Sequence, residues 1–377
     1  MEKDKLIFAA SIRLSIDNPS SGIMKKVFAE ARVLEESFDV YLWGFNDNSI
    51  VFIHDGEMTE VAKFTNNIDK RRKYFKEIAL FSIQISAKAF YYRYATCDFP
   101  LLKALRRISS RSIKCVIEIP TYPYKGEYSR SIKNRMIYLL DCLTRWRLKY
   151  YVDRIVLVTS MPKVLFGIPC INISNGIDFS TTSVVKNPTL TPVKLIAVSS
   201  MLPHHGYDRL IEGAKLYYSN IPSKAVAIYL VGDGPEFNKY NRMVTDNSLE
   251  NIVSICGRLS GRQLDDLFDH SAAAIGSLGL HRLGLKAAST LKIREYVSRG
   301  LPVVYSTDDD LLDGKSYGYK LPADESPVPI EKVIEYVEAM YQTDGVNELI
   351  RKAAYSLCDM SVVMKPVVDY FVTAIES

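Results

Sequence analysis

Two charged residues, Lys292 and Glu295, stand three positions apart where the sequence predicts a short helix between a glycine-rich loop and a buried strand. Thr290 is typical of a helix start, Gly300 ends the helix, and Pro302 prevents it from resuming. A lysine and a glutamate at this spacing either form an ion pair on a solvated helix face or bind a polar ligand. The pattern alone leaves both interpretations open, so the elements that position the helix have to be considered.

The N-terminal half of the chain predicts the start of a parallel sheet, because a buried strand, a polar loop, an amphipathic helix and a second strand follow one another. Two further buried strands with a helix between them continue this pattern. The expected elements are strands at 5–12, 38–45, 114–120 and 153–160, and helices at about 23–37 and 130–150.

The strand–helix alternation restarts after the polar segment "STTSVVKNPTLTP" at 180–192, which we interpret as a linker. The expected elements of the second half are strands at 193–200, 224–234, 251–257 and 272–278, and helices at 206–220 and 260–271. In open parallel sheets ligands bind outside the carboxyl ends of the strands. The loops that follow these strands are therefore expected to line a binding cleft.

The sequence thus predicts an α/β protein with two doubly wound, Rossmann-like domains that face each other across a cleft. We expect residues 1–182 to form an N-terminal domain and residues 193–360 to form a C-terminal domain. The tail at about 361–377 is a helix candidate that can pack back on the first domain. Pro366 is expected to kink or split that helix.

Composition and charge narrow the class of protein. The chain has 377 residues, of which 47% are hydrophobic, and no run of eighteen apolar residues. Its start lacks a cleavable signal, so we expect a cytoplasmic protein. The six cysteines show no metal-ligand or disulfide spacing.

Residues 1–180 hold 28 Lys and Arg against 19 Asp and Glu, and the remainder holds 20 against 24. A basic first half suits a phosphorylated ligand or an anionic membrane surface. Nucleic acid is not expected as a partner, because no nucleic-acid-binding motif is present.

Five motifs occur in order along nearly the whole chain: Gly22 after the first strand, "ISNGIDFS", "AVSSMLPHHGYDRLIEGA", "LVGDGPEFNKY" and "LKIREYVSRGLPVV". This ordered set resembles the retaining nucleotide-sugar glycosyltransferases of GT-B fold, in particular the large family 4. The "HGYDRLI" and "GSLGLHR" segments are most similar to members that build bacterial surface polysaccharides.

The resemblance implies that Lys292 and Glu295 bind the donor. A glutamate at the position of Glu295 binds the ribose hydroxyls of the donor nucleotide, and an ionised carboxylate accepts strong hydrogen bonds from a diol. The backbone amides of Thr290, Leu291 and Lys292 open the same helix and would face the donor diphosphate. The Lys292 ammonium would add a positive charge there.

Two further segments carry donor contacts by resemblance. Gly257, Arg258 and Leu259 follow a strand end, where family members use the backbone against the nucleotide base. Gly22 lets the backbone approach a phosphate or an acceptor closely, although a tight turn alone would also explain it.

Two departures from the family pattern need replacements. Family members often carry a sugar-binding glutamate where this chain has Ala287, and we expect His281 and Arg282 to take over catalytic contacts with the sugar or its phosphate. The family usually clamps the diphosphate with an arginine and a lysine. Here Ser200 and His205 stand near those two places.

The resemblance implies transfer from a UDP-sugar with retention at the anomeric carbon, the donor's own phosphate assisting the incoming hydroxyl. No cofactor is expected. We also predict metal independence, because no suitable Asp-x-Asp triplet lies near the site and "DDD" at 308–310 falls in an expected loop. A nucleotide-sugar epimerase of the same fold and a non-catalytic partner subunit remain alternatives.

The acceptor side is less constrained. A glycan or lipid-linked acceptor is implied by the resemblance, and Glu118, Tyr122 and Tyr124 in "EIPTYPYKGEY" are candidates to meet it. Residues 125–154 are rich in Lys and Arg around "MIYLL" and Trp146. They predict either an interfacial helix on anionic lipid at the inner face of the plasma membrane or a helix packed on the sheet with a solvated basic face.

Overall fold

The computed structural model describes residues 3–15, 22–128, 131–158 and 161–376. The chain divides into two compact units. Unit 1 comprises Met1–Ser174 with Val363–Ser377, and unit 2 comprises Asn175–Val362. The predicted linker at 180–192 is not a free connection, because Phe179 and Val185 are buried in the core of unit 2. These two side chains place the boundary before the polar segment.

Unit 1 is built on a nine-stranded sheet with the order β4-β3-β2-β1-β5-β6-β7-β9-β8. Its strands are β1 (Lys5–Arg13), β2 (Asp39–Asn46), β3 (Ser49–His54), β4 (Glu57–Lys63), β5 (Ala89–Arg93), β6 (Lys114–Ile119), β7 (Arg154–Val158), β8 (Val164–Leu165) and β9 (Ile168–Ile173). The six strands from β2 to β9 in this order pair in parallel, while β3, β4 and β8 pair antiparallel with their neighbours.

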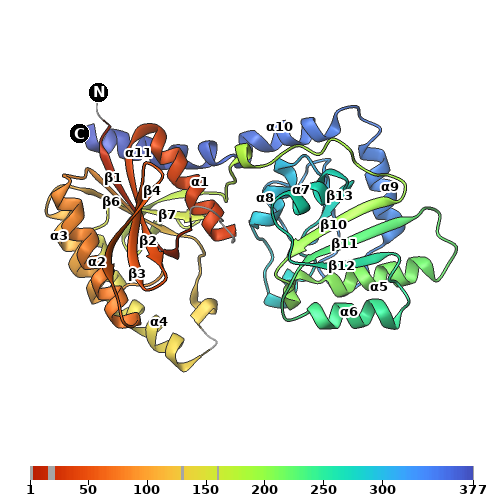
Figure 1. The fold of residues 1–377 in the computed structure, drawn as a ribbon, viewed down its shortest axis with the longest axis horizontal. Coiled ribbons are helices and arrows are strands. Elements are labelled where there is room, and N and C mark those ends of the chain that lie inside the picture. Colours follow the sequence, from red (N-terminus) through yellow and green to blue (C-terminus); the bar gives the residue numbers. More distant parts are fainter. Residues whose placement is uncertain (1–2, 16–21, 129–130, 159–160, 377) are drawn as a thin grey trace. The chain divides into compact units, whose positions relative to one another are not determined.

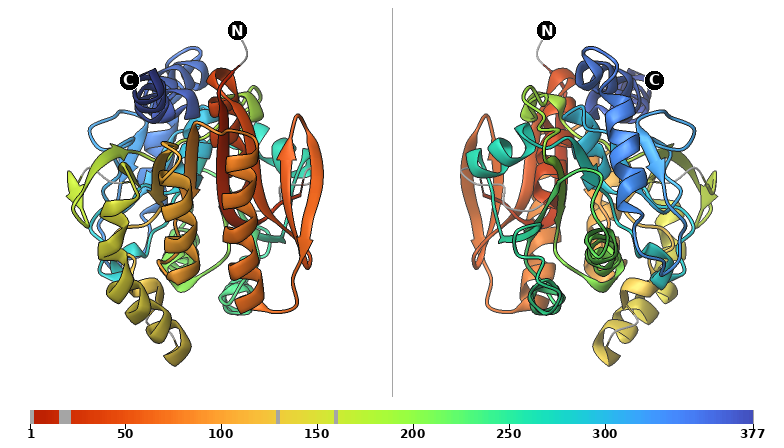
Figure 2. Two further views of the ribbon diagram at one scale, coloured as in Figure 1. Left: turned by 90° about the vertical axis from the view of Figure 1, so that its left-hand side faces the viewer. Right: turned by 90° about the vertical axis from the view of Figure 1, so that its right-hand side faces the viewer.

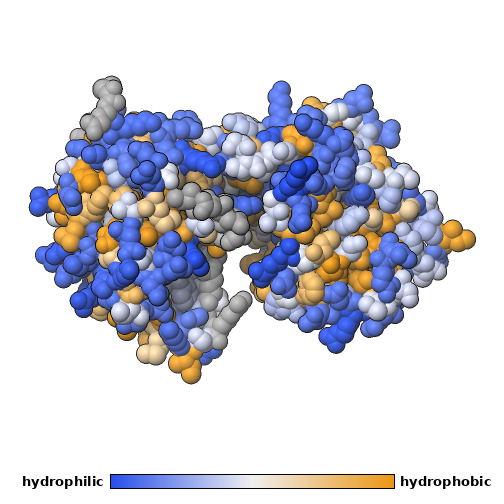
Figure 3. All heavy atoms as spheres, in the orientation of Figure 1, coloured by the Kyte–Doolittle hydropathy of each residue, from blue (hydrophilic) through white to orange (hydrophobic). Residues whose placement is uncertain are grey.

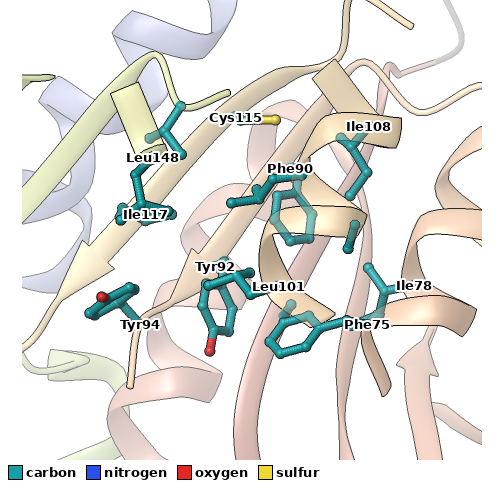
Figure 4. Close-up of a cluster of buried hydrophobic side chains, with 14 of the residues drawn as sticks. Phe75, Ile78, Phe90, Tyr92, Tyr94, Leu101, Ile108, Cys115, Ile117 and Leu148 are labelled. Carbon is teal, nitrogen blue, oxygen red and sulfur yellow. The ribbon is translucent and has the colours of Figure 1, made fainter. Parts of the chain in front are cut away.

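Helices cover both faces of this sheet (Figures 1 and 2). They are α1 (Gly22–Ser37), α2 (Asn67–Gln84), α3 (Phe99–Ser109) and the greater part of α11 (Met360–Glu376). Unit 1 also holds α4 (Ile132–Thr144) and the short 3-10 helices η1 (Lys125–Tyr128) and η2 (Arg145–Tyr150). Figure 4 shows the core on one face, where side chains from α2 and α3 meet alternate residues of β5 and β6. The labelled members are Phe75, Ile78, Phe90, Tyr92, Tyr94, Leu101, Ile108, Cys115, Ile117 and Leu148.

The C-terminal helix closes the other face of unit 1. The ring of Phe371 lies 6.0 Å from that of Phe38 and 6.4 Å from that of Tyr91. The expectation that Pro366 splits this helix is wrong, since α11 runs through it. Met364, Val367 and Phe371 are fully buried around the proline, and this packing outweighs the one backbone hydrogen bond that proline cannot make.

Unit 2 is built on a six-stranded parallel sheet with the order β12-β11-β10-β13-β14-β15. Its strands are β10 (Val193–Ser199), β11 (Val226–Gly232), β12 (Val253–Gly257), β13 (Ala273–Ile275), β14 (Val303–Tyr305) and β15 (Gly318–Lys320). In chain order this is 3-2-1-4-5-6, the doubly wound order of a Rossmann fold.

Helices cover both faces of this second sheet (Figure 1). They are α5 (Tyr207–Tyr218), α6 (Phe237–Asp246), α7 (Arg262–Asp269), α8 (Leu291–Ser298), α9 (Ile330–Met340) and α10 (Val346–Cys358), with 3-10 helices η3 (Phe179–Thr181), η4 (Pro203–His205) and η5 (Leu280–Leu283). Apolar residues of α5, α6 and α9 form one core with the sheet, and those of α7, α8 and α10 form the other. Two α/β units with parallel sheets confirm the predicted fold class.

A buried ion pair holds α8, the helix that carries Lys292 and Glu295, in place. Nη1 of Arg294 lies 2.6 Å from Oδ2 of Asp309, and both side chains are completely buried. Asp310 binds the same guanidinium. The "DDD" segment at 308–310 therefore holds the helix in place.

We expect Arg294→Met to destabilise unit 2 by about 3–5 kcal/mol, because a carboxylate is left buried without its cation. The measurement is the urea midpoint of unfolding. Arg262→Ala is the matched control, since its side chain is 94% exposed beside Asp266. Equal midpoints for Arg294→Met and the wild-type protein would contradict this role.

Candidate functional site

The candidate site lies at the switch point of the sheet in unit 2. The connections from β10 and β13, which pair side by side, lead to opposite halves of the sheet, so the loops after them diverge and leave a crevice. The amide of Leu278, after β13, donates to the carbonyl oxygen of His205, after β10, at 2.8 Å. This bond holds the two loops together beside the start of α8.

Close backbone packing builds these loops. Gly206 has φ +67°, and a Cβ atom there would lie 2.6 Å from the amide nitrogen of Gly279. Gly232 has φ +130°, and a Cβ atom there would lie 1.7 Å from the carbonyl oxygen of Ser199. The glycine of "LVGDG" thus serves the packing of the β11 turn on the end of β10.

His205 is held as a neutral imidazole. Its Nδ1 atom accepts a hydrogen bond from the amide of Leu202 at 3.0 Å. Burial, followed by the nearby charge of Lys292, lowers the pKa of His205 to about 2. With Nδ1 accepting, the ring proton resides on Nε2, which is a donor. The sequence predicted a histidine donor here, and the geometry makes it a donor without a charge.

Lys292 is a partly buried cation without an anionic partner. Its Nζ atom donates to the hydroxyl oxygen of Tyr207 at 3.3 Å and lies 5.6 Å from the centre of that ring. In the described part of the chain no carboxylate oxygen lies within 4.0 Å of it. Burial lowers the pKa of Lys292 to about 7. An anion beside the ammonium would restore the charge.

The start of α8 offers further unsatisfied donors. Thr290 is the N-cap residue, but its side chain forms no capping hydrogen bond, and its Oγ1 atom is buried without a partner among the described residues. The amides that follow, including those of Leu291 and Lys292, have no intrahelical acceptor. Asn175 holds Ser289, the residue before Thr290, because its Nδ2 atom donates to the carbonyl oxygen of Ser289 at 2.6 Å. A ligand with several acceptor oxygens would satisfy this helix start.

Glu295 lies one turn further along α8. Its Oε1 atom is 3.3 Å from Nη2 of Arg299, which also lies 2.7 Å from Oδ1 of Asp265. The Glu295 side chain is 22% exposed, so lone pairs of its carboxylate remain accessible to a ligand. Lys292 and Glu295 therefore do not form an ion pair with each other, because Glu295 faces Arg299 and Lys292 contacts Tyr207.

Arg282 does not offer the free guanidinium that its predicted catalytic role requires. Its Nη2 atom donates to both carboxylate oxygens of Asp208 at 3.1 and 3.2 Å, and its Nη1 atom donates to the carbonyl oxygen of Pro203 at 2.6 Å. Glu325 accepts from Nε at 2.9 Å and also binds Nη2. These contacts tie η5 to η4 and α5.

His281 is bound in the same cluster. Its Nε2 atom lies 2.7 Å from Oε1 of Glu325, and its Nδ1 atom is buried without a partner among the described residues. Arg282 and then His281 lower the pKa of Glu325 to about 2. The catalytic roles predicted for His281 and Arg282 remain predictions, and the structure supports their action through the loop rather than on a ligand.

The remaining predicted residues lie at loop ends. Ser200 is exposed after β10. Gly257, with φ +65°, ends β12, and Arg258 after it is 81% exposed with Nε 3.4 Å from Oδ2 of Asp233. Leu259 is half-buried beside the core of unit 2. Gly22 is the exposed first residue of α1 in unit 1.

Ala287 is exposed and forms a backbone bridge with Asp308. Its backbone thus joins the segment that holds α8, but its methyl group cannot bind a hydroxyl. Within the described ranges, no group of three or more His, Cys, Asp or Glu side chains is arranged to hold a metal ion.

Sequence reasoning missed three residues of the site: Tyr207, Asp208 and Glu325. Tyr207 and Asp208 stand in the quoted "HGYDRLI" motif, and a carboxylate in the first turn of a helix is a signal for an electrostatic partner. Glu325 lies 43 positions from Arg282 and carries no such signal.

No family model and no curated protein matches the sequence. The structure is similar to several solved glycosyltransferases. A glycosyltransferase from Rickettsia africae ESF-5 has a TM-score of 0.67 and 12% identity over 100% of both chains. Sucrose-phosphate synthase from Thermosynechococcus elongatus has a TM-score of 0.66 and 11% identity over 98% of this chain and 100% of that chain. Anabaena HepE in complex with UDP has a TM-score of 0.62 and 12% identity, again over 98% and 100%. At such identities the likeness shows the fold, and the chain has the predicted GT-B fold of two Rossmann-like units.

We expect Arg282→Ala to destabilise unit 2 by about 2 kcal/mol, since Asp208 and Glu325 lose the cation that joins them. The measurement is the thermal midpoint. Arg258→Ala is the control, because that arginine is largely exposed. A midpoint that stays at the wild-type value would show that the Arg282 network carries no stability.

We expect a diphosphate at the start of α8 to be bound with proton uptake. The pKa of Lys292 is about 7 in the free protein, and a bound anion raises it toward its ordinary value. At a pH of about 8.5 the free lysine is mostly neutral and the bound one charged, so roughly one proton is taken up. Calorimetry with UDP in two buffers of different ionisation enthalpy measures this number. Lys292→Met should abolish the uptake, and wild-type binding without proton exchange would refute the assignment.

Proposed function

We propose that this protein is a retaining glycosyltransferase of family 4 type, which moves a sugar from a UDP-sugar to a hydroxyl group of a glycan or lipid-linked acceptor. The observation that carries the proposal is the uncompensated Lys292 cation beside the neutral His205 donor and the open start of α8. All three lie at the switch point of a parallel sheet, where such sheets bind nucleotides.

The departing diphosphate is the group that this arrangement suits. When the bond between sugar and phosphate breaks, negative charge develops on the phosphate oxygen, and fixed donors lower the energy of that state. Lys292 supplies positive charge, His205 supplies the Nε2 proton as a hydrogen bond, and the amides that open α8 supply backbone donors. Because these groups are held before the reaction, little reorganisation is needed during it.

The nucleoside would be recognised from the same helix and the neighbouring strand end. Glu295 accepts hydrogen bonds from the ribose hydroxyls, and Arg299 orients its carboxylate through the 3.3 Å contact. The backbone at Gly257, Arg258 and Leu259 contacts the base. Ser200, at the exposed end of β10, is a further donor toward the phosphates.

Retention is proposed from the family resemblance. In that route the acceptor hydroxyl attacks on the face from which the diphosphate leaves, and a phosphate oxygen takes the hydroxyl proton. The route requires no protein nucleophile, and none of the predicted site residues would form a bond to the sugar. Positioning and charge stabilisation would carry the rate.

A pocket of about 160 Å³ in unit 1 is the proposed acceptor site. It opens where β5 and β6 end, and aromatic rings at its wall can stack on a sugar. The hydroxyl groups of Tyr94, Tyr124 and Tyr128 already donate to Asp141, Asp141 and Ala95, so the rings and the backbone are the groups offered to an acceptor. Its lining residues are Tyr94, Ala95, Ile119, Pro120, Thr121, Tyr124 and Tyr128.

Glu118 cannot take the acceptor role predicted for it. Its carboxylate is completely buried and accepts hydrogen bonds from Lys26 at 2.8 Å and from Arg93 at 2.8 and 3.0 Å. Burial and the neighbouring Glu118 raise the pKa of Glu30, in the same cluster, to about 7. Lys26 and Arg93 neutralise the Glu118 carboxylate, so the cluster is a structural support beneath the ends of β5 and β6.

A nucleotide-sugar epimerase fits less well, because it needs an acid and a base near the sugar. Asp208 and Glu325, two carboxylates beside the site loops, are both held by Arg282. A non-catalytic subunit would keep nucleotide binding without turnover.

The test is a thermal-shift screen of UDP-, GDP- and TDP-sugars, followed by an assay of nucleotide release with oligosaccharide and lipid-linked acceptors. Binding stabilises the native state by mass action, so a donor should raise the midpoint. Transfer with retained anomeric configuration supports the proposal. Binding without turnover would favour the non-catalytic subunit, and the absence of any nucleotide effect would refute the donor site.

We expect Glu295→Gln to weaken UDP binding by about 1.5–3 kcal/mol, because a charge-assisted contact to the ribose becomes a neutral one. The fold should persist, since Arg299 retains Asp265 as a partner. Calorimetry measures the affinity, with Glu331→Gln on the exposed start of α9 as control. Equal affinities of the Glu295 variant and the wild type would exclude the ribose contact.

A further inference from the structure

Helix α4 of unit 1 shows its apolar side to solvent. Ile132, Met136, Leu139 and Leu143 are exposed by 77%, 68%, 59% and 63%, and they recur at the spacing of one helix face. The 3-10 helix η2 continues the stripe with Trp146, 48% exposed, and Tyr150, 61% exposed. We call this set of six residues the α4–η2 face.

The polar side of α4 is the buried one. Asp141 is completely buried and accepts hydrogen bonds from the hydroxyl of Tyr124 at 2.7 Å and from the amide of Cys97 at 2.7 Å. Tyr94 also donates to it, and Arg145 lies 3.2 Å from its Oδ2 atom. Four partners of one carboxylate fix the rotation of the helix. The apolar stripe therefore cannot turn inward without leaving a buried charge unpaired.

The figures agree with this orientation. In Figures 1 and 2, α4 projects from the rest of unit 1, and in Figure 3 hydrophobic side chains reach the surface at its projecting end. A contiguous exposed apolar stripe on a soluble unit marks an interaction site. The sequence left open a helix packed on the sheet with a solvated basic face. The basic residues are indeed solvated, but the exposed apolar side of α4 contradicts packing of that side on the sheet.

The charge around the stripe indicates the kind of partner. Asp141 is the single acidic residue between positions 131 and 151, and it is buried. The basic residues of the same segment are at the surface or partly exposed: Lys133, Arg135, Arg145, Arg147 and Lys149. Nearby, Lys163 and Val164 are exposed on and before β8. Within residues 131–151 the surface thus combines apolar side chains with positive charge.

We infer that the α4–η2 face docks on an anionic phospholipid bilayer. Apolar side chains enter the interface, the surrounding lysines and arginines bind lipid phosphates, and a tryptophan sits at the headgroup level. A second copy of the chain is a poorer occupant, because it would bring an equally basic face against this one. Among the described helices none is both long and apolar enough to cross a membrane.

The inference has a consequence that rests on the proposed function. Tyr94 and Tyr124, which bind Asp141 of α4, also line the proposed acceptor pocket. Docking through α4 would hold that pocket beside the lipid headgroups. An acceptor carried on a lipid would then reach the pocket without leaving the membrane.

Co-sedimentation with vesicles tests the docking without any need for transfer. The full-length protein is mixed with phosphatidylcholine vesicles, or with vesicles of phosphatidylcholine and phosphatidylglycerol in a ratio of about 2:1. We expect binding to the acidic vesicles at about 0.1 M salt and release at about 1 M salt, where screening is strong. Equal binding to both kinds of vesicle, or binding to neither, would overturn the inference.

Two variants separate the apolar and the basic contributions. Leu139→Gln with Leu143→Gln removes exposed apolar groups, and we expect about a tenfold loss of vesicle affinity or more. Lys133→Gln with Arg147→Gln and Lys149→Gln should lose about fivefold per charge. Ile68→Gln with Ile221→Gln is the matched control, because these isoleucines are 84% and 98% exposed elsewhere. Loss of binding in the control as well would overturn the assignment to this face.

Tryptophan fluorescence gives a second readout. The chain has two tryptophans, of which Trp43 is completely buried and Trp146 lies on the face. We expect a blue shift on acidic vesicles that is absent from Trp146→Phe. A wild-type dimer that dissociates in the Leu139→Gln, Leu143→Gln variant, without vesicle binding, would instead assign the face to a second copy. Vesicle binding without any nucleotide binding would leave the docking intact and remove the proposed transferase.

Discussion

The candidate site depends on one positive charge that the protein leaves without an anion. Lys292 is held against Tyr207, and burial brings the pKa of its ammonium group down to about 7. Keeping such a group in the free protein costs stability, because a desolvated cation gains nothing from water or from a carboxylate. The fold accepts that cost at the start of a helix, where a bound anion would find the ammonium and the backbone donors together.

Every other buried cation near this place has a partner, and these partners form the frame around Lys292. Arg294 is neutralised by Asp309 beneath α8, and Arg209 donates to the carbonyl oxygens of Leu278 and Ser326. Arg282 joins Asp208 to Glu325. Since the guanidinium groups of these arginines already bind carboxylates or carbonyl oxygens, they hold loops in place. Lys292 differs from them because no carboxylate among the described residues neutralises its ammonium group.

Buried charges in unit 1 also have partners, and they support the strand ends and orient α4. The cluster of Lys26, Arg93 and Glu118 neutralises its charges internally beneath the ends of the strands. Asp141 of α4 is likewise saturated, and its fixed position forces the apolar side of the helix outward. A buried carboxylate thus determines an exposed hydrophobic face. The proposed acceptor pocket and the α4–η2 face share this one anchor.

The sequence by itself determined the alternation of strands and helices, because hydrophobic periodicity and turn residues are local signals. It therefore predicted two α/β units and the helix that carries Lys292 and Glu295. It also gave the order of the loops that follow β10 and β13. Only the tertiary structure decided which charges are free. Arg282 and Glu118 looked available in the sequence, yet their partners lie 43 and 74 positions away for Arg282, and 92 and 25 for Glu118. The same limit applied to α4, whose pattern left open a helix on lipid or a helix packed on the sheet until the contacts of Asp141 fixed its rotation. A charge is neutralised by what lies near it in space, and no local pattern carries that information.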